Sequence, residues 1–245
     1  MYRLVFDKLK LSSVPQQERL LFFALGHLAN EINALNKQVL WCFKPDAEPP
    51  VVARAQVSLG LMYLRLLAGK LKEGYLLLQR HYLPGQPSLA TVYDRCLLPD
   101  ARNALTFLKR YFGKANNVDT VRTNYSFHYS PEELEAGIAL VPDDLELFVS
   151  QMQGNSFYYA SEVLANQAMI RAVDAGAEAQ DVFGQLVQEI RDVARHSIGF
   201  AGGFMVAFGS RHKDIWVGPG EPIELSQLVT LRSFQVPWFA FEPST

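Results

Sequence analysis

The segment VRTNYSFHYSPEE, from Val121 to Glu133, carries the side chains of this sequence that are best suited to chemistry. Arg122 and His128 stand in it with five residues between them. Arginine is a permanent cation whose planar fork of donors matches phosphate oxygens, and histidine can move a proton near neutral pH. In RNA the 2′-hydroxyl is an internal nucleophile, so His128 could take its proton or give one to the leaving 5′-oxygen while Arg122 stabilises the charge on phosphorus. Such a pair needs no metal and no other cofactor.

A structural interpretation of the same string stays open. Arg122 could pair with a carboxylate such as Asp119, and Phe127, His128 and Tyr129 could form a turn whose aromatic rings fill the core. A string of one arginine and one histidine is short and common, so the spacing alone does not separate the two interpretations.

A strong helix start follows the histidine. Ser130 is a favourable N-cap, Pro131 suits the first helical position, and Glu133 can close a capping box. We therefore predict a helix that begins at residue 131. His128 lies two residues before the cap, at the positive end of that helix, where an anion is favoured.

A basic face is predicted on the helix that precedes the string. It consists of Arg102, Lys109, Arg110 and Lys114. The formal net charge of the chain is only -2, so any contact with a polyanion must come from a local patch of this kind. The four residues could hold an RNA backbone, and an ordinary solvated helix face would explain them equally well.

Helical periodicity dominates the elements that must position these residues. Apolar residues recur at three- and four-residue steps over residues 15–43, 51–82, 97–112, 155–174 and 179–209. The last of these contains Gly199, Gly202 and Gly203, each of which costs a helix about 1 kcal/mol and so suggests close helix packing or a bend. From Asp214 onward the chain is rich in Pro and Gly with short β-prone runs. The pattern predicts an all-α fold of long antiparallel helices with a short irregular or β-hairpin tail.

Composition places the chain among ordinary globular proteins of one large or two small domains. It has 245 residues, of which 49% are apolar and 20% charged. We predict a helical bundle over residues 1–140, an additional helical region over 141–213 that can share the same core, and a tail over 214–245. The apolar run Ser197 to Gly209 falls short of the roughly 20 residues of a spanning helix, so no transmembrane segment is expected. Cys42 and Cys96 are interpreted as buried reduced thiols, which with the absence of a signal peptide predicts a cytoplasmic location.

Several familiar catalytic patterns are absent from the sequence. It has no Gly-rich phosphate loop, no HExxH and no Gly-x-Ser-x-Gly, and none of its five histidines has a Glu three residues before it. Neither a metal site nor a cofactor is expected.

The stretch FLKRYFGKANNVDTVRTNYSFHY resembles the HEPN superfamily, in which Arg-x(4 to 6)-His lies at a helix junction after long antiparallel helices. The resemblance covers roughly the first 140 residues and is closest to an uncharacterised bacterial branch. It implies a HEPN-like up-down bundle and a metal-independent endoribonuclease with Arg122 and His128 as its catalytic pair. Asn124, Ser126 and Tyr129 are auxiliary candidates.

The resemblance also implies partners. HEPN nucleases work as dimers in which the Arg and His of both subunits meet, so we expect a homodimer that acts on RNA as a toxin or phage-defence effector, with an antitoxin or regulatory protein as a further partner. Thr123 departs from the family, where Asn, Asp or His often follows the arginine. The alternative is a non-enzymatic helical binding or scaffold protein in which the string is structural and the last helix or the aromatic tail docks a partner.

Overall fold

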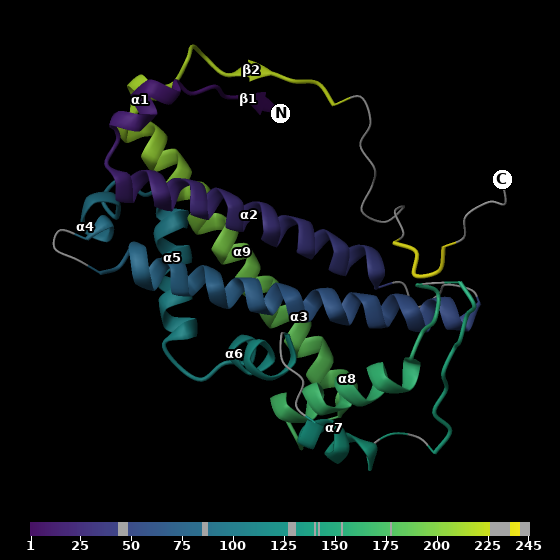
Figure 1. Ribbon diagram of the computed structural model, residues 1–245. Helices are drawn as coiled ribbons and strands as arrows, with labels where there is room; N and C mark the ends of the chain where they lie inside the picture. Colours follow the sequence, from purple (N-terminus) through teal and green to yellow (C-terminus); the bar gives the residue numbers. More distant parts are fainter. Residues whose placement is uncertain are drawn as a thin grey trace, which may run out of the picture. The chain divides into compact units, whose positions relative to one another are not determined.

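A computed structural model describes residues 1–43, 49–84, 88–126, 131–139, 141, 143–152, 154–176, 178–225 and 236–240. The fold is all-α with a short two-stranded sheet, as predicted (Figure 1). In chain order the elements are β1 (Tyr2–Arg3), α1 (Lys8–Ser13), α2 (Gln16–Cys42), α3 (Pro50–His81), α4 (Leu89–Tyr93), α5 (Pro99–Phe112), α6 (Asn117–Val121), the π-helical turn η1 (Arg122–Ser126), α7 (Pro131–Ile138), α8 (Tyr159–Val173), α9 (Ala179–Arg211), the 3₁₀ turn η2 (Lys213–Ile215) and β2 (Glu221–Pro222).

The long helices follow the apolar periodicity closely. The stripes over residues 15–43, 51–82, 97–112, 155–174 and 179–209 become α2, α3, α5, α8 and α9, and α7 begins at Pro131 as its capping sequence indicates. The pattern did not reveal α1, α4 and α6, which have six, five and five residues. Helices of one or two turns are too short to repeat a stripe, so they depend on tertiary packing and caps.

The chain forms two compact units, each assembled from three separate stretches. The first unit consists of Met1–Ile32, Lys70–Lys114 and Asp192–Val229. The second consists of Asn33–Gly69, Ala115–Arg191 and Thr230–Thr245. The boundaries predicted after residues 140 and 213 stay a prediction.

Large side chains of α2, α4 and α9 fill the core of the first unit. Leu21 and Leu25, from the predicted stripe of α2, are each 1% exposed. Tyr93 at the end of α4 is fully buried, and its ring centroid lies 4.8 Å from that of Phe204 on α9.

Two neighbouring glycines of α9 have opposite surroundings in this unit. A Cβ atom added at Gly203 would lie 2.2 Å from the Cβ atom of Ala101 on α5. A Cβ atom at Gly202 would meet nothing within 4 Å. The close packing that the glycines suggested is therefore real at Gly203 and absent at Gly202.

The second unit is built around aromatic and polar contacts of α2, α3, α6, α8 and α9. Phe43, just after α2, meets Phe183 of α9 with ring centroids 5.5 Å apart. Trp238 of the tail packs on the buried ring of Phe157 at 4.9 Å. The aromatic tail therefore contributes at least this ring to the packing of its own chain.

The two cysteines differ in exposure. Cys42 is fully buried, as expected, and its burial raises the pKa of the thiol to about 11. Cys96 is exposed, so the expectation of two buried thiols was wrong for this residue. It lies in the turn between α4 and α5, beyond the last buried residue of α4, where its thiol reaches only the carbonyl of Val92 at 3.9 Å.

Helix α3 is long and apolar enough to cross a membrane by length and composition, with a mean hydropathy of 1.3 in its most apolar window. Half of that window is buried inside the structure. Helix α3 is the only such helix in the part of the chain that the structure describes. The expected absence of a transmembrane segment stays a prediction.

Candidate functional site

Arg122 stands where a short helix of the second unit changes its winding. Asn116 caps α6, because its side-chain oxygen accepts a hydrogen bond from the Asp119 N–H at 2.9 Å. At the other end of α6, the backbone N–H of Arg122 donates back to the carbonyl of Asp119. The chain then continues as the π-helical turn η1. Such turns are rare and are frequent at functional sites, so Arg122 begins an unusual piece of backbone.

Two hydroxyl groups hold η1 in place. The Ser126 hydroxyl donates to the carbonyl of Arg65 on α3 at 2.6 Å, and the Tyr125 hydroxyl donates to the carbonyl of Ala168 on α8 at 3.0 Å. Ser126, predicted as an auxiliary residue, therefore serves the backbone of the turn. Sequence reasoning missed Tyr125, whose only signal was that the hydroxyl of a packed tyrosine needs a polar partner.

The attachment point on α3 is itself fixed. The Arg65 guanidinium, whose side chain is 12% exposed, forms an ion pair with Glu162 of α8 at 3.4 Å. At the first residue of α6, the Asn117 amide donates to the Glu189 carboxylate of α9 at 2.8 Å. The backbone around Arg122 is thus tied to α3, α8 and α9 by polar side chains.

The arginine side chain is half-buried, and its Nε atom is inaccessible to water. Thr123 is exposed and Asn124, an auxiliary candidate, is half-buried. His128 and Tyr129 lie outside the described residues. The pairing of Arg122 with His128 therefore stays a prediction.

Three residues of the predicted basic face, Arg102, Lys109 and Arg110, lie on α5 of the first unit, and Lys114 follows shortly after this helix. All four side chains are exposed. Their contact with RNA stays a prediction.

An aromatic stack lies beside the basic residues of α5. The Phe107 ring stacks on His196 of α9 with centroids 3.7 Å apart, and the Arg110 guanidinium lies over the Phe107 ring, 5.9 Å from its centroid. His196 also uses its Nδ1 atom, which lies 2.7 Å from the Asp192 carbonyl. Basic groups beside flat aromatic rings are typical of surfaces that bind single-stranded nucleic acid.

A buried polar cluster, which the sequence did not reveal, joins three helices of the first unit. The Glu18 carboxylate of α2, 5% exposed, accepts a hydrogen bond from the hydroxyl of Tyr93 on α4. The same oxygen lies 2.7 Å from Nε2 of His212, directly after α9, and 3.5 Å from Nε of Arg211. Burial raises the pKa of Tyr93 well above its usual value, and the bond to Glu18 raises it further. We call these four residues the Glu18 cluster.

The sequence did contain one signal for this cluster. Glu18 lies three residues before Leu21 and so continues the apolar stripe of α2. A carboxylate on a buried stripe requires partners, because an unpaired buried charge is very costly. His212 supplies one of them and is half-buried. The polar groups of the cluster form hydrogen bonds and ion pairs with one another, and none of them is a nucleophile. The arrangement therefore fits a structural role that links the helices.

No group of three or more His, Cys, Asp or Glu side chains that could hold a metal ion occurs among the described residues.

Comparisons with protein-family models, with curated proteins and with solved structures found no match to this chain.

Proposed function

We propose that the chain is a cytoplasmic, metal-independent endoribonuclease of HEPN type, with Arg122 and His128 as its catalytic pair. The observation that carries the proposal is the tethered turn η1, which begins at Arg122 and ends at Ser126, two positions before His128 in the sequence. Catalytic groups need a backbone that is fixed by surrounding hydrogen bonds, and the Ser126 and Tyr125 hydroxyls provide such support.

The proposed reaction uses the RNA itself as the nucleophile. His128 removes the proton from the 2′-hydroxyl, the 2′-oxygen attacks phosphorus, and the bond to the 5′-oxygen breaks after that oxygen receives a proton. The products are a 2′,3′-cyclic phosphate and a 5′-hydroxyl. Arg122 stabilises the negative charge on the non-bridging oxygens, for which its fork of N–H donors is well shaped.

The basic face of α5 is the proposed contact with the RNA backbone. Lys109 and Arg110 are exposed, and the Arg110 guanidinium lies over the Phe107 ring that stacks on His196. Phosphate contacts of this kind strengthen binding without reading sequence, and they weaken steeply with salt. The proposal includes a homodimer in which the pairs of both subunits meet, and an antitoxin or regulatory protein that restrains the activity.

The test is cleavage of a labelled single-stranded RNA in the presence of a chelator. We expect wild-type protein to leave 2′,3′-cyclic phosphate ends, and His128→Ala and Arg122→Ala to lose at least a hundredfold in rate. Arg171→Ala is the matched control, because Arg171 is an exposed arginine of the same unit on α8. Arg122 is half-buried, so its replacement can also destabilise the fold. If Arg122→Lys cleaves RNA more slowly at an unchanged melting temperature, the lost rate reflects lost chemistry and not lost stability. Equal rates for wild type and His128→Ala would refute the proposal.

A second candidate function is a non-enzymatic helical binding protein. The observation that favours it is that the hydroxyls of Tyr125 and Ser126 both donate hydrogen bonds to carbonyls of neighbouring helices, so part of the string is structural. If Arg122 belongs to the same framework, Arg122→Ala lowers the melting temperature by several degrees, because the groups around its buried donor lose that donor. That result, together with no RNA cleavage by the wild type, would favour this function.

A further inference from the structure

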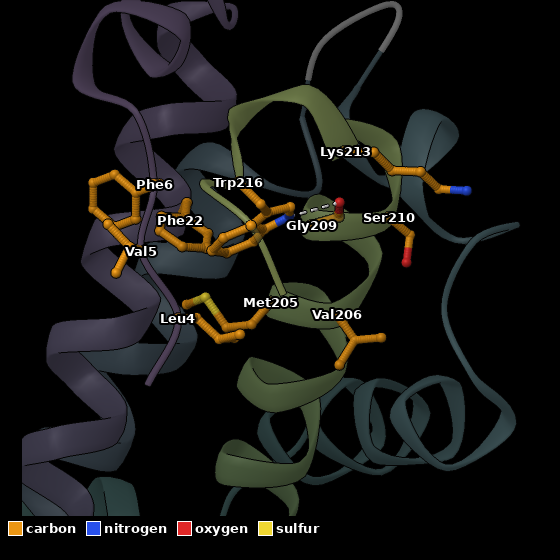
Figure 2. A pocket seen from close by; sticks show the side chains of 11 residues that line it. Leu4, Val5, Phe6, Phe22, Met205, Val206, Gly209, Ser210, Lys213 and Trp216 are labelled. Carbon is orange, nitrogen blue, oxygen red and sulfur yellow. Dashed lines mark hydrogen bonds between the residues drawn. The ribbon is translucent and has the colours of Figure 1, made fainter. Parts of the chain in front are cut away.

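We propose that the first unit contains a binding site for a small amphiphile that has a long apolar body and one negatively charged end. The site is a pocket of about 700 Å³ between the N-terminal segment, α2, the end of α9 and the segment after η2 (Figure 2). This volume lies within the range of roughly 300–1,000 Å³ that is usual for small-molecule pockets.

Apolar side chains form most of the pocket wall. Leu4, Val5 and Phe6 come from the segment between β1 and α1, Phe22 from α2, and Met205 and Val206 from α9. Methionine adapts its shape easily, so Met205 lets such a wall fit ligands of different outline. The wall is therefore suited to a flexible hydrocarbon body.

Several of these side chains remain in contact with water although they face a concave surface. Leu4 is 61% exposed and Val206 is 54% exposed. Covering such groups releases about 25 cal/mol for each Å² of apolar area removed from water. A ligand that fills the pocket covers these exposed apolar side chains, and the hydrophobic effect then contributes to the free energy of binding.

Backbone hydrogen bonds and a short ladder hold the N-terminal wall of the pocket to the segment after α9. The backbone N–H of Asp7 donates to the carbonyl of Ile215 at 2.7 Å, and that of Val217 donates to the carbonyl of Val5 at 2.8 Å. Beyond them, β1 and β2 pair over only two residues each. The segment that carries Leu4 and Phe6 is therefore held at its base by α1 and at its tip by a two-residue ladder.

The polar groups of the pocket gather at one end. Figure 2 shows Ser210 and Lys213 on the side opposite Val5 and Phe6, with Trp216 between the two sides. The Trp216 ring N–H is already used, because it donates to the Gly209 carbonyl at 3.1 Å. The Ser210 hydroxyl and the Lys213 ammonium group are what remain for a ligand. The Lys213 side chain extends away from Trp216 in Figure 2, so it must turn toward the pocket to meet a bound anion.

Charge decides which end group fits. No acidic residue occurs among the described residues that line the pocket, and Lys213 forms no ion pair within the described part of the chain. An exposed ammonium group at the rim of an apolar pocket attracts an anion and disfavours a cation. A carboxylate at the end of an alkyl chain matches both the wall and the rim.

The experiment uses the full chain and two probes with the same dodecyl chain, dodecanoate and dodecyltrimethylammonium, below their micelle concentrations. Calorimetry measures stoichiometry and affinity, and Trp216 in the wall reports binding by its fluorescence. We expect one dodecanoate per chain, bound at least tenfold more tightly than the cationic probe. Lys213→Glu should remove this preference, whereas Lys10→Glu, an exposed lysine outside the pocket, should leave it unchanged.

A second pair of variants tests the pocket itself. Val206→Trp fills the space and should weaken dodecanoate binding at least tenfold, while Leu20→Trp, at a residue that is 56% exposed and outside the lining, should not. The proposal is overturned if dodecanoate does not saturate one site, or if each variant behaves like its control. It is also overturned if wild type is a dimer that Val206→Trp dissociates, since a second copy then covers this face.

Discussion

The adjacent glycines of α9 allow a test of the helix packing in the first unit, because the same substitution should have opposite effects at the two positions. Gly203→Ala places a methyl group 2.2 Å from the Cβ atom of Ala101 and 3.5 Å from its Cα atom. Carbon atoms pack at roughly 3.5–4.0 Å, so α5 and α9 must separate locally. Gly202→Ala places the methyl group in open space.

The expected magnitudes follow from two opposing effects. Overpacking costs about 1–3 kcal/mol, and replacing glycine by alanine inside a helix returns about 1 kcal/mol. Gly203→Ala should therefore lower the free energy of unfolding by up to about 2 kcal/mol, while Gly202→Ala should raise it by up to about 1 kcal/mol. The two variants should differ by roughly 1–3 kcal/mol, or about 2–12 °C in melting temperature for a chain of this size.

Urea and thermal unfolding followed by circular dichroism measure both variants against wild type. Ala101→Gly removes the opposing methyl group, so the double variant Ala101→Gly, Gly203→Ala should recover part of the lost stability. If Gly203→Ala proves as stable as Gly202→Ala, the close approach of α5 and α9 at this point is wrong.

Three further predictions concern buried groups. Glu18→Ala should destabilise the fold by about 1–3 kcal/mol in urea unfolding, because the Tyr93 hydroxyl and His212 lose their acceptor, and Glu18→Gln, which keeps an acceptor oxygen, should cost less; equal losses would contradict the hydrogen-bond argument. A thiol reagent at pH 8 should modify Cys96 quickly and Cys42 only after unfolding, since burial raises the pKa of Cys42 to about 11; two fast thiols per chain would contradict the buried position. The folded state keeps the Cys42 proton to a higher pH than the unfolded state, so stability is fully present below pH 9 and falls by up to about 3 kcal/mol as the pH rises from 9 to 11, a loss that Cys42→Ala should remove.

Local sequence patterns predicted the long helices because those helices depend on regular burial. The stripe through Leu21 and Leu25 set the buried face of α2, and Pro131 marked the start of α7. The glycines of α9 indicated close packing. Only the position of the partner helix shows that Gly203 needs to lack a side chain, whereas Gly202 does not.

The candidate sites depend on contacts between distant residues, which a single sequence does not encode locally. Glu18, Tyr93 and His212 come from the start, the middle and the end of the chain, and each alone resembles a surface or a core residue. Similarly, nothing near Ser126 in the sequence indicates that the carbonyl of Arg65 accepts its hydroxyl. The sequence predicted the type of chemistry at Arg122, whereas the supporting hydrogen bonds required the fold.

The pairing of β1 with β2 has a consequence for the order in which the chain assembles during translation. Val5 is synthesised more than two hundred residues before its backbone partner Val217. At about 5–20 residues per second, the segment that carries Val5 waits on the order of ten seconds or more for that partner. The wall of the pocket is therefore among the last parts of the first unit to close.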